Sequence, residues 1–228
     1  MIGDLTEADA ALYFADRKAH GFNTVWINLL GNGYTGCNSD GSTWDGVQPF
    51  TTPGDFSTPN EAYFAHADRI IQLAAQYGLL VILDPVETGG WLTIMQDNGV
   101  DKLRVYGQYL GQRYKNFDNI IWMSGNDYQN WGASLDPYVT AVALGIQDYD
   151  PRHIQTIELN LGSGSLDDGT WAPIISLNAS YTYDPTYEQV LNDLIAPISC
   201  RPSWSSRTTN RNKTRFHWCY GGRSTGRS

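Results

Sequence analysis

The chain of 228 residues contains little cysteine and little positive charge, and it lacks long apolar runs. Its three cysteines, Cys37, Cys200 and Cys219, do not have the spacing of a metal site, and an odd number is not a disulfide framework, so we expect Cys37 to be a free thiol. The net charge of −9 argues against a nucleic-acid partner, which would require a basic face. Because no apolar run approaches the roughly 20 residues of a membrane span, we expect no membrane partner.

The composition is that of a packed globular protein, with 41% hydrophobic and 17% charged residues. Aromatic side chains are numerous, with 8 Trp and 14 Tyr. Such rings have an apolar face and often a polar edge, which suits ligands such as sugars. The histidines have no H-E-x-x-H spacing and no Gly-rich phosphate turn follows an expected strand, so the sequence predicts neither a metal nor a nucleotide cofactor.

The charge is divided unevenly along the chain. Residues 1–197 hold all 24 acidic residues and 8 of the 15 basic ones, a net charge of −16, whereas residues 198–228 hold 7 basic residues and no acid, a net charge of +7. The second segment has no strong helical or strand pattern, and 10 of its 31 residues are Ser or Thr. We therefore expect a folded domain at 1–197 and a disordered basic tail at 198–228. The alternative is a basic arm that binds an acidic partner or a membrane surface.

The first 197 residues alternate between helix and strand patterns. Short apolar runs, typical of buried parallel strands, occur at 24–30, 79–87, 119–127, 154–160 and 175–183. Amphipathic segments with capping signals precede or follow them at 6–20, 60–77, 99–115, 136–147 and 185–195. This alternation indicates a parallel sheet covered by helices, either a (β/α)8 barrel or an open sheet.

Polar side chains lie at the carboxyl end of strand after strand, where the active site of a barrel is built. These residues are Asn28, Asp84, Glu87, Asn126, Asp127, Glu158, Asn160 and Tyr183. Facing carboxylates in an aromatic cleft suit glycoside hydrolysis, and Asp127, with Asn126 beside it to bind a sugar hydroxyl, is the best single candidate. The alternative for each residue is that it caps the following helix.

The stretch 31–59 is longer than an ordinary connection, and such loops are usually functional or disordered. It contains Tyr34, Trp44, Phe50 and Phe56 among Gly, Ser, Thr and Asp residues. These rings could stack on sugars, or they could fold the loop onto the barrel.

Four segments resemble the apiosidase-like family of glycoside hydrolases: 16–26 (DRKAHGFNTVW), 57–64 (STPNEAYF), 81–91 (VILDPVETGGW) and 114–128 (YKNFDNIIWMSGNDY). The resemblance covers about residues 3–197. It implies a (β/α)8 TIM barrel of the retaining-glycosidase type, with an acid/base carboxylate after strand four and a nucleophilic Glu after strand seven. By position, Asp127 resembles the acid/base. Trp91 and the other polar residues at the strand ends resemble pocket residues that bind the carbohydrate substrate.

The chain departs from this family pattern at both ends. Five residues precede Thr6, where the first strand would lie, and the segment after Ile195 lacks the expected strand seven and its Glu. We therefore expect an incomplete barrel without its first and last two strands. With suitable synonymous codons, DNA that encodes residues 200–212 and 218–227 can encode family-like amino-acid sequences in a shifted reading frame. We therefore hypothesise that the tail is frame-shifted.

The resemblance implies hydrolysis of O-glycosidic bonds in side chains of plant-type polysaccharides. Without the nucleophile, we expect little or no turnover. The alternative is a non-catalytic carbohydrate-binding module or pseudoenzyme. Such substrates suggest a secreted or periplasmic protein, although no signal peptide is recognisable in residues 1–20. The sequence does not predict an oligomeric state.

Overall fold

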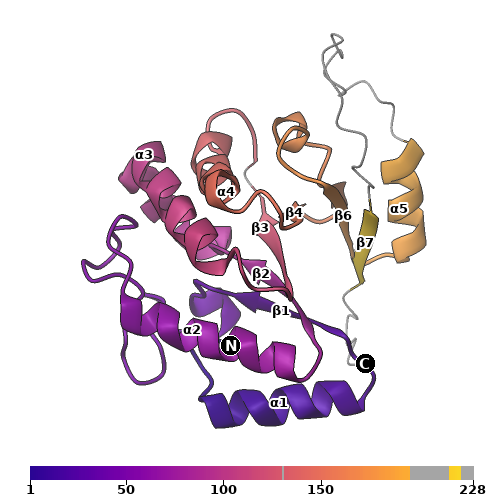
Figure 1. Cartoon of the computed structure of the whole chain (residues 1–228). Helices are drawn as coiled ribbons and strands as arrows, with labels where there is room; N and C mark the ends of the chain where they lie inside the picture. The colour runs from indigo at the N-terminus through magenta and orange to yellow at the C-terminus, as the bar shows by residue number, and fades with distance from the viewer. Residues whose placement is uncertain (130, 196–215, 222–228) are drawn as a thin grey trace, which may run out of the picture.

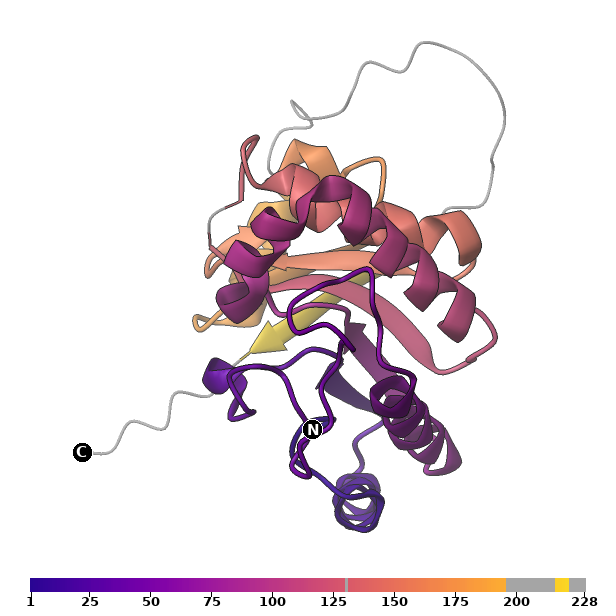
Figure 2. The same cartoon turned by 90° about the vertical axis from the view of Figure 1, so that its left-hand side faces the viewer.

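A computed structural model describes residues 1–129, 131–195 and 216–221. Four parallel strands lie in the order β1-β2-β3-β4, and helices α1 to α4 cover the outer face of this sheet (Figures 1 and 2). The strands are β1 (Thr24–Asn28), β2 (Leu80–Asp84), β3 (Ile120–Tyr128) and β4 (Gln155–Leu159). The helices are α1 (Glu7–Ala19), α2 (Glu61–Gln76), α3 (Thr88–Tyr114) and α4 (Asp136–Tyr149).

A second sheet lies beside the first, with β6 next to β4. It has the order β5-β6-β7, with β5 (Ser163–Gly164) antiparallel to β6 (Leu177–Thr182) and β7 (Phe216–Gly221) parallel to it. Helix α5 (Thr186–Ile195) and two short 3-10 helices, η1 (Gly33–Thr35) and η2 (Gly169–Trp171), complete the described elements. Buried Ser165 joins the two sheets, because its hydroxyl donates to the carbonyl oxygen of Ile157 on β4 and contacts that of Ala179 on β6.

This arrangement is part of a barrel wall. Within the described residues β1 pairs only with β2 and β7 only with β6, so the arc of strands does not close. The expected incomplete (β/α)8 barrel is confirmed in this respect. Strand β7 differs from the expectation, since it lies within the segment predicted to be a disordered tail and stands beside β6 where a further barrel strand would be. The remainder of that segment, 198–215 and 222–228, lies outside the described residues.

The hydrophobic core lies between the sheet and its helices. Val25 and Ile27 on β1 face the same side as Val81 and Leu83, their partners on β2, and all four belong to one buried cluster with the helices. This alternation places every second side chain on the concave face, where the barrel interior would be. Helices α3 and α4 approach closely through glycine: a Cβ at Gly107 would lie 2.2 Å from a backbone oxygen of α4.

Most predicted helix boundaries agree with the structure. The side chain of Thr6 accepts the N–H of Asp9 and caps α1, as predicted, whereas α2 is capped by Asn60. Helix α3 differs more, because it begins at Thr88 and is interrupted at Gly99, whose φ of 74° is left-handed. The predicted helix at 99–115 is therefore only its second half.

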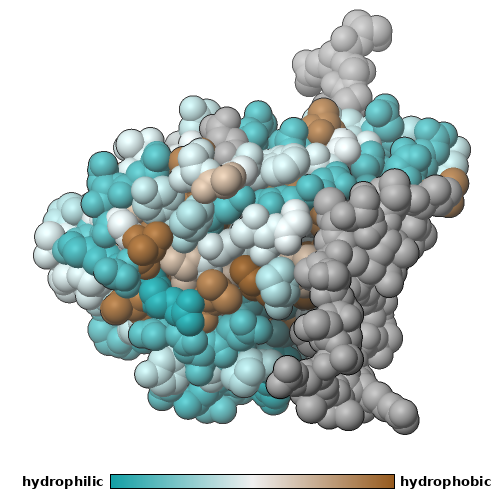
Figure 3. All heavy atoms as spheres, turned by 90° about the horizontal axis from the view of Figure 1, so that it is seen from above, coloured by the Kyte–Doolittle hydropathy of each residue, from teal (hydrophilic) through white to brown (hydrophobic). Residues whose placement is uncertain are grey.

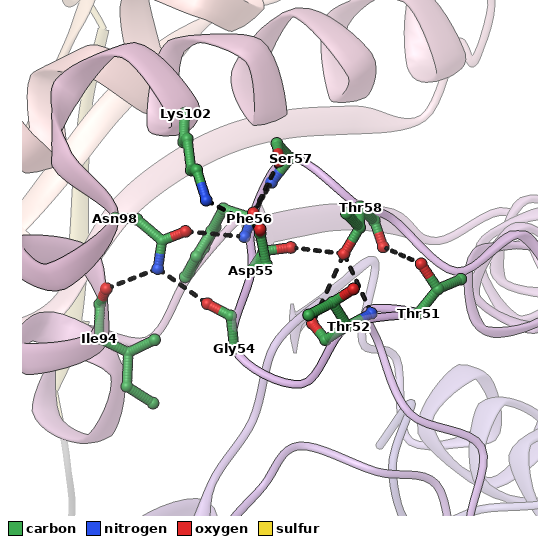
Figure 4. A network of polar contacts seen from close by, with 10 residues as sticks. All are labelled: Thr51, Thr52, Gly54, Asp55, Phe56, Ser57, Thr58, Ile94, Asn98 and Lys102. Atoms are coloured by element: carbon green, nitrogen blue, oxygen red, sulfur yellow. Dashed lines mark hydrogen bonds and ion pairs between the residues drawn. The ribbon is translucent and has the colours of Figure 1, made fainter.

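The long loop at 31–59 is anchored to α3 (Figure 4). Asn98 accepts the N–H of Phe56 at 3.0 Å, and its amide group donates to the carbonyl oxygen of Gly54 at 2.8 Å, while Lys102 pairs with Asp55 at 2.8 Å. The rings of Phe50 and Phe56 are buried, with their centroids 4.8 Å apart. These two aromatic residues therefore fold the loop onto the barrel.

The surface on one side of the molecule is mixed in character: seen from above, separate brown apolar patches lie among teal and white residues (Figure 3). In the part of the chain that the structure describes, no helix has the length and apolar character to cross a membrane. The same residues contain no group of three or more His, Cys, Asp or Glu side chains placed to hold a metal ion.

Candidate active site

Four carboxyl groups meet at the carboxyl ends of neighbouring strands. Asp84 ends β2, Glu87 follows it at the start of α3, Asp127 lies near the end of β3, and Glu158 lies on β4. The parallel order β2-β3-β4 brings them to one edge, where Glu87 also bridges Gly125 through the backbone. The four groups repel one another electrostatically, which places them within one charge cluster.

The backbone that carries Asp127 is distorted. The register between β3 and β4 shifts between Ser124 and Tyr128, and Asn126 and Asp127 both have left-handed backbones, with φ of 56° and 59°. Asn and Asp tolerate this conformation better than other non-glycine residues, but normally as single residues, so two in succession indicate local strain. Gly125 fits closely against β4, because a Cβ there would lie 2.3 Å from the backbone oxygen of Glu158. Such strain is found where a structure fixes a functional side chain.

Glu158 holds this distorted segment in place. Its Oε2 accepts the backbone N–H of Asp127 at 3.0 Å. The Asp127 carboxyl has one oxygen, Oδ2, that accepts from Gln129 at 2.8 Å, whereas Oδ1 is buried and has no hydrogen-bond partner in the protein. A buried acceptor without a partner is costly, so Oδ1 of Asp127 marks a position at which a hydrogen-bond donor is missing.

Burial favours the protonated forms of Glu158, Asp84 and Glu87. It raises the pKa of Glu158 to about 8 against the opposing effect of the Asp127 N–H. Burial, followed by repulsion from Glu87, raises the pKa of Asp84 well above its usual range. The pKa of Glu87 is also raised by burial, although the N–H groups of Gly89 and Gly90 lower it. At neutral pH the Glu158 carboxyl therefore carries a proton for most of the time.

The predicted amide and aromatic residues also lie at strand ends or just beyond them. Asn28 lies opposite Asp84 in the register of β1 and β2. Asn160 accepts from the indole N–H of Trp131 at 2.6 Å. Tyr183 is 59% exposed, and its hydroxyl accepts from that of Tyr181 at 2.7 Å.

Trp91 is placed differently from the expected pocket residue. It is only 2% exposed, its ring packs edge-on against Phe50 and Phe56, and its indole N–H donates to the carbonyl oxygen of Gly31 at 3.0 Å. The ring therefore belongs to the core that anchors the loop.

Sequence reasoning missed several residues that support the site. Buried Asn32 donates from its amide group to Glu87, and Gln129 donates to Asp127. Tyr181 lies close enough to Asp127 and Glu158 for their charges to raise the pKa of its hydroxyl, after the larger effect of burial. The only sequence feature that could have indicated Asn32 as a site residue was its position soon after the strand at 24–30. The loop contains many other polar residues, so this position did not distinguish it.

The family model of the apiosidase-like catalytic domain matches residues 1–215. The chain belongs to the apiosidase-like family. This match continues beyond residue 197, where the resemblance in the sequence was expected to end. Membership of this family makes the chain similar to glycoside hydrolases. The expected barrel fold also agrees with the solved structures that resemble the chain.

Solved structures resemble this apiosidase-like chain over most of its length. A glycoside hydrolase has a TM-score of 0.67 and 25% identity, with 78% of this chain and 39% of that chain covered. A glycoside hydrolase family 5 protein from Bacteroides vulgatus ATCC 8482 also has a TM-score of 0.67, with 23% identity, 78% of this chain and 38% of that chain covered. Endoglucanase Z of Dickeya dadantii (strain 3937) is 23% identical over 120 residues, which are 52% of this chain and 27% of that protein. The chain thus spans less than half the length of these relatives.

Proposed function

We propose that the carboxyl cluster is the acid side of an O-glycoside hydrolase site, in which Asp127 protonates the leaving oxygen. The observation that carries this proposal is the buried, unpartnered Oδ1 of Asp127 on a strained backbone segment held by Glu158. Asp127 as a whole is half-buried at the end of a barrel strand, so a ligand oxygen can approach its carboxyl group, and Oδ1 has no protein partner with which the ligand would compete. The family match supports glycosidic oxygen as that ligand.

In this reaction Asp127 donates its proton to the glycosidic oxygen as the bond to the anomeric carbon breaks. A second carboxylate either attacks the anomeric carbon or activates water, and about 5 Å or about 6.5–9.5 Å between the carboxyl groups distinguishes the two routes. Asn126, beside the acid, is suited to bind the 2-hydroxyl of the sugar. Glu158 acts through the Asp127 backbone and so positions the acid.

The proposed substrates are side chains of plant-type polysaccharides, and the proposed turnover of this polypeptide is low. The family pattern places a nucleophilic Glu after strand seven, whereas residues 198–228 contain no Asp or Glu. A general acid alone contributes roughly 10²–10⁴-fold, a small part of what both carboxylates achieve together.

The test compares hydrolysis of aryl glycosides and pectic oligosaccharides by three proteins: this chain, a version with the tail restored to the shifted frame, and the restored version carrying Asp127→Asn. We expect turnover by the restored version, a loss of 10²-fold or more with Asp127→Asn, and little turnover by this chain. Full activity of the Asp127→Asn variant would refute the role of Asp127. Calorimetric sugar binding without turnover by the restored version would support a non-catalytic carbohydrate-binding module instead.

A further inference from the structure

Tyr34 is the most exposed of the large hydrophobic side chains in the described residues, at 86%. It lies in the middle of η1, at the beginning of the long loop that follows β1. Exposing an aromatic ring to water forgoes the free energy that its burial would give. Phe50 and Phe56 of the same loop are fully buried, so the loop could have placed another ring in the core.

The backbone under Tyr34 is fixed by a set of hydrogen bonds. The Asn32 side chain accepts the N–H of Tyr34 at 2.8 Å, and the Thr35 hydroxyl accepts the N–H of Asn32 at 2.9 Å, which together form a capping box. Gly36 then ends η1 with a left-handed φ of 82°. The exposed ring therefore projects from a rigid support and not from a free loop tip.

The support of Tyr34 connects directly to the carboxyl cluster. The amide group of Asn32, which is only 3% exposed, donates to Oε2 of Glu87. The Asn32 side chain also packs directly against Gly90 on α3, where a Cβ would overlap it. Tyr34 thus lies two residues from a side chain that touches the site, on the loop beside it.

We propose that Tyr34 is an aromatic platform that binds the apolar face of a sugar ring next to the one whose bond Asp127 cleaves. The inference rests on the proposed function and names a specificity-determining residue for it. A tyrosine on a fixed backbone loses little conformational freedom on binding, which makes its exposed ring an efficient contact. The platform would favour oligosaccharides over single sugars, because only the longer ligand reaches both Asp127 and Tyr34.

The experiment measures binding of pectic oligosaccharides and of their component monosaccharides to the full chain by isothermal titration calorimetry. Four proteins are compared: the unsubstituted chain, Tyr34→Ala, Tyr34→Phe and Tyr149→Ala. Tyr149 is the matched control, since it is also exposed but lies at the end of α4 that leads to the opposite edge of the sheet. Thermal unfolding of each variant establishes that the fold is retained.

Covering about 60 Å² of ring surface corresponds to about a tenfold change in affinity. We expect Tyr34→Ala to weaken oligosaccharide binding by about this factor and to leave monosaccharide binding unchanged. Tyr34→Phe, which keeps the ring, and the Tyr149→Ala control should stay within about twofold of the unsubstituted chain. If the unsubstituted chain and Tyr34→Ala bind the oligosaccharide with equal affinity, the role proposed for Tyr34 is refuted, whereas the proposed function is not. If the unsubstituted chain binds no carbohydrate, both the role of Tyr34 and the proposed substrate class are refuted. The role of Asp127 as the acid is tested separately, by the hydrolysis assay with the restored Asp127→Asn variant.

Discussion

Replacing Glu158 with glutamine should remove a pH-dependent loss of stability. Glutamine has nearly the same shape, and its amide oxygen can still accept the backbone N–H of Asp127 that Glu158 accepts at 3.0 Å. The substitution therefore keeps the distorted backbone of β3 in place and changes only the ability to ionise. Glu158 is 6% exposed, so its ionised form is poorly solvated in the folded chain.

The magnitude follows from the pKa of Glu158, which burial raises from 4.5 to about 8. At 1.36 kcal/mol per pH unit, this range corresponds to about 5 kcal/mol. Because the folded pKa lies above the unfolded one, the contribution to stability is fully present below about pH 4.5 and is lost as pH rises towards about 8. Above that pH both states are ionised, and the contribution levels off.

The assay is urea unfolding of the unsubstituted chain and of Glu158→Gln at intervals from pH 4.5 to pH 9. The free energy of unfolding of the variant should exceed that of the unsubstituted chain by an amount that grows to several kcal/mol by pH 8. Taking this difference removes the effects of titrating groups that lie too far from Glu158 to interact with it, which are common to both proteins. Glu188→Gln, at an exposed position on α5, is the control and should give no such difference. Parallel pH profiles for Glu158→Gln and the unsubstituted chain would refute the burial of an ionisable carboxyl at this position.

Two other substitutions test the surroundings of the site. Trp91→Phe should lower the free energy of unfolding by about 1–2 kcal/mol, because a buried hydrogen bond to a backbone carbonyl is lost. It should leave carbohydrate affinity unchanged. Weaker carbohydrate binding at unchanged stability would instead indicate that Trp91 is a pocket residue. Asp168→Asn should reduce the loss of stability that accompanies ionisation of Asp136 as pH rises. Burial, and then repulsion from the buried Asp168 carboxyl, raises the pKa of Asp136, and an amide at position 168 carries no charge. Urea unfolding measures both effects, and an unchanged pH profile for Asp168→Asn would contradict the second.

The strand ends could be predicted from the sequence because they depend on local pattern and on one topological rule. Asp84, Asp127 and Glu158 each end or nearly end an apolar run, and parallel strands bring their carboxyl ends together. The capping of α1 by Thr6 is equally local. These features require only short-range preferences and the alternation of helix and strand.

Other features could not be predicted because they depend on contacts between distant segments. The burial of an aromatic residue in the loop depends on its contacts with α3. Phe50 and Phe56 pack against Trp91 of that helix, whereas Tyr34 is exposed to water. The interruption of α3 at Gly99 separates two helical halves that the sequence pattern did not join. The pairing of β7 with β6 likewise joins segments that are far apart in the chain.

By itself, the sequence determined the acidic, aromatic-rich character of residues 1–197, the order of helices and strands, and the residue types at the strand ends, because these are written in composition and periodicity. Only the tertiary structure decided which of these residues act together. It bent the backbone at Asn126 and Asp127, placed the Glu158 carboxylate on the Asp127 amide, and left one carboxyl oxygen of Asp127 without a partner. The physical reason is that burial, strain and hydrogen-bond satisfaction are properties of neighbours in space, which here come from different strands.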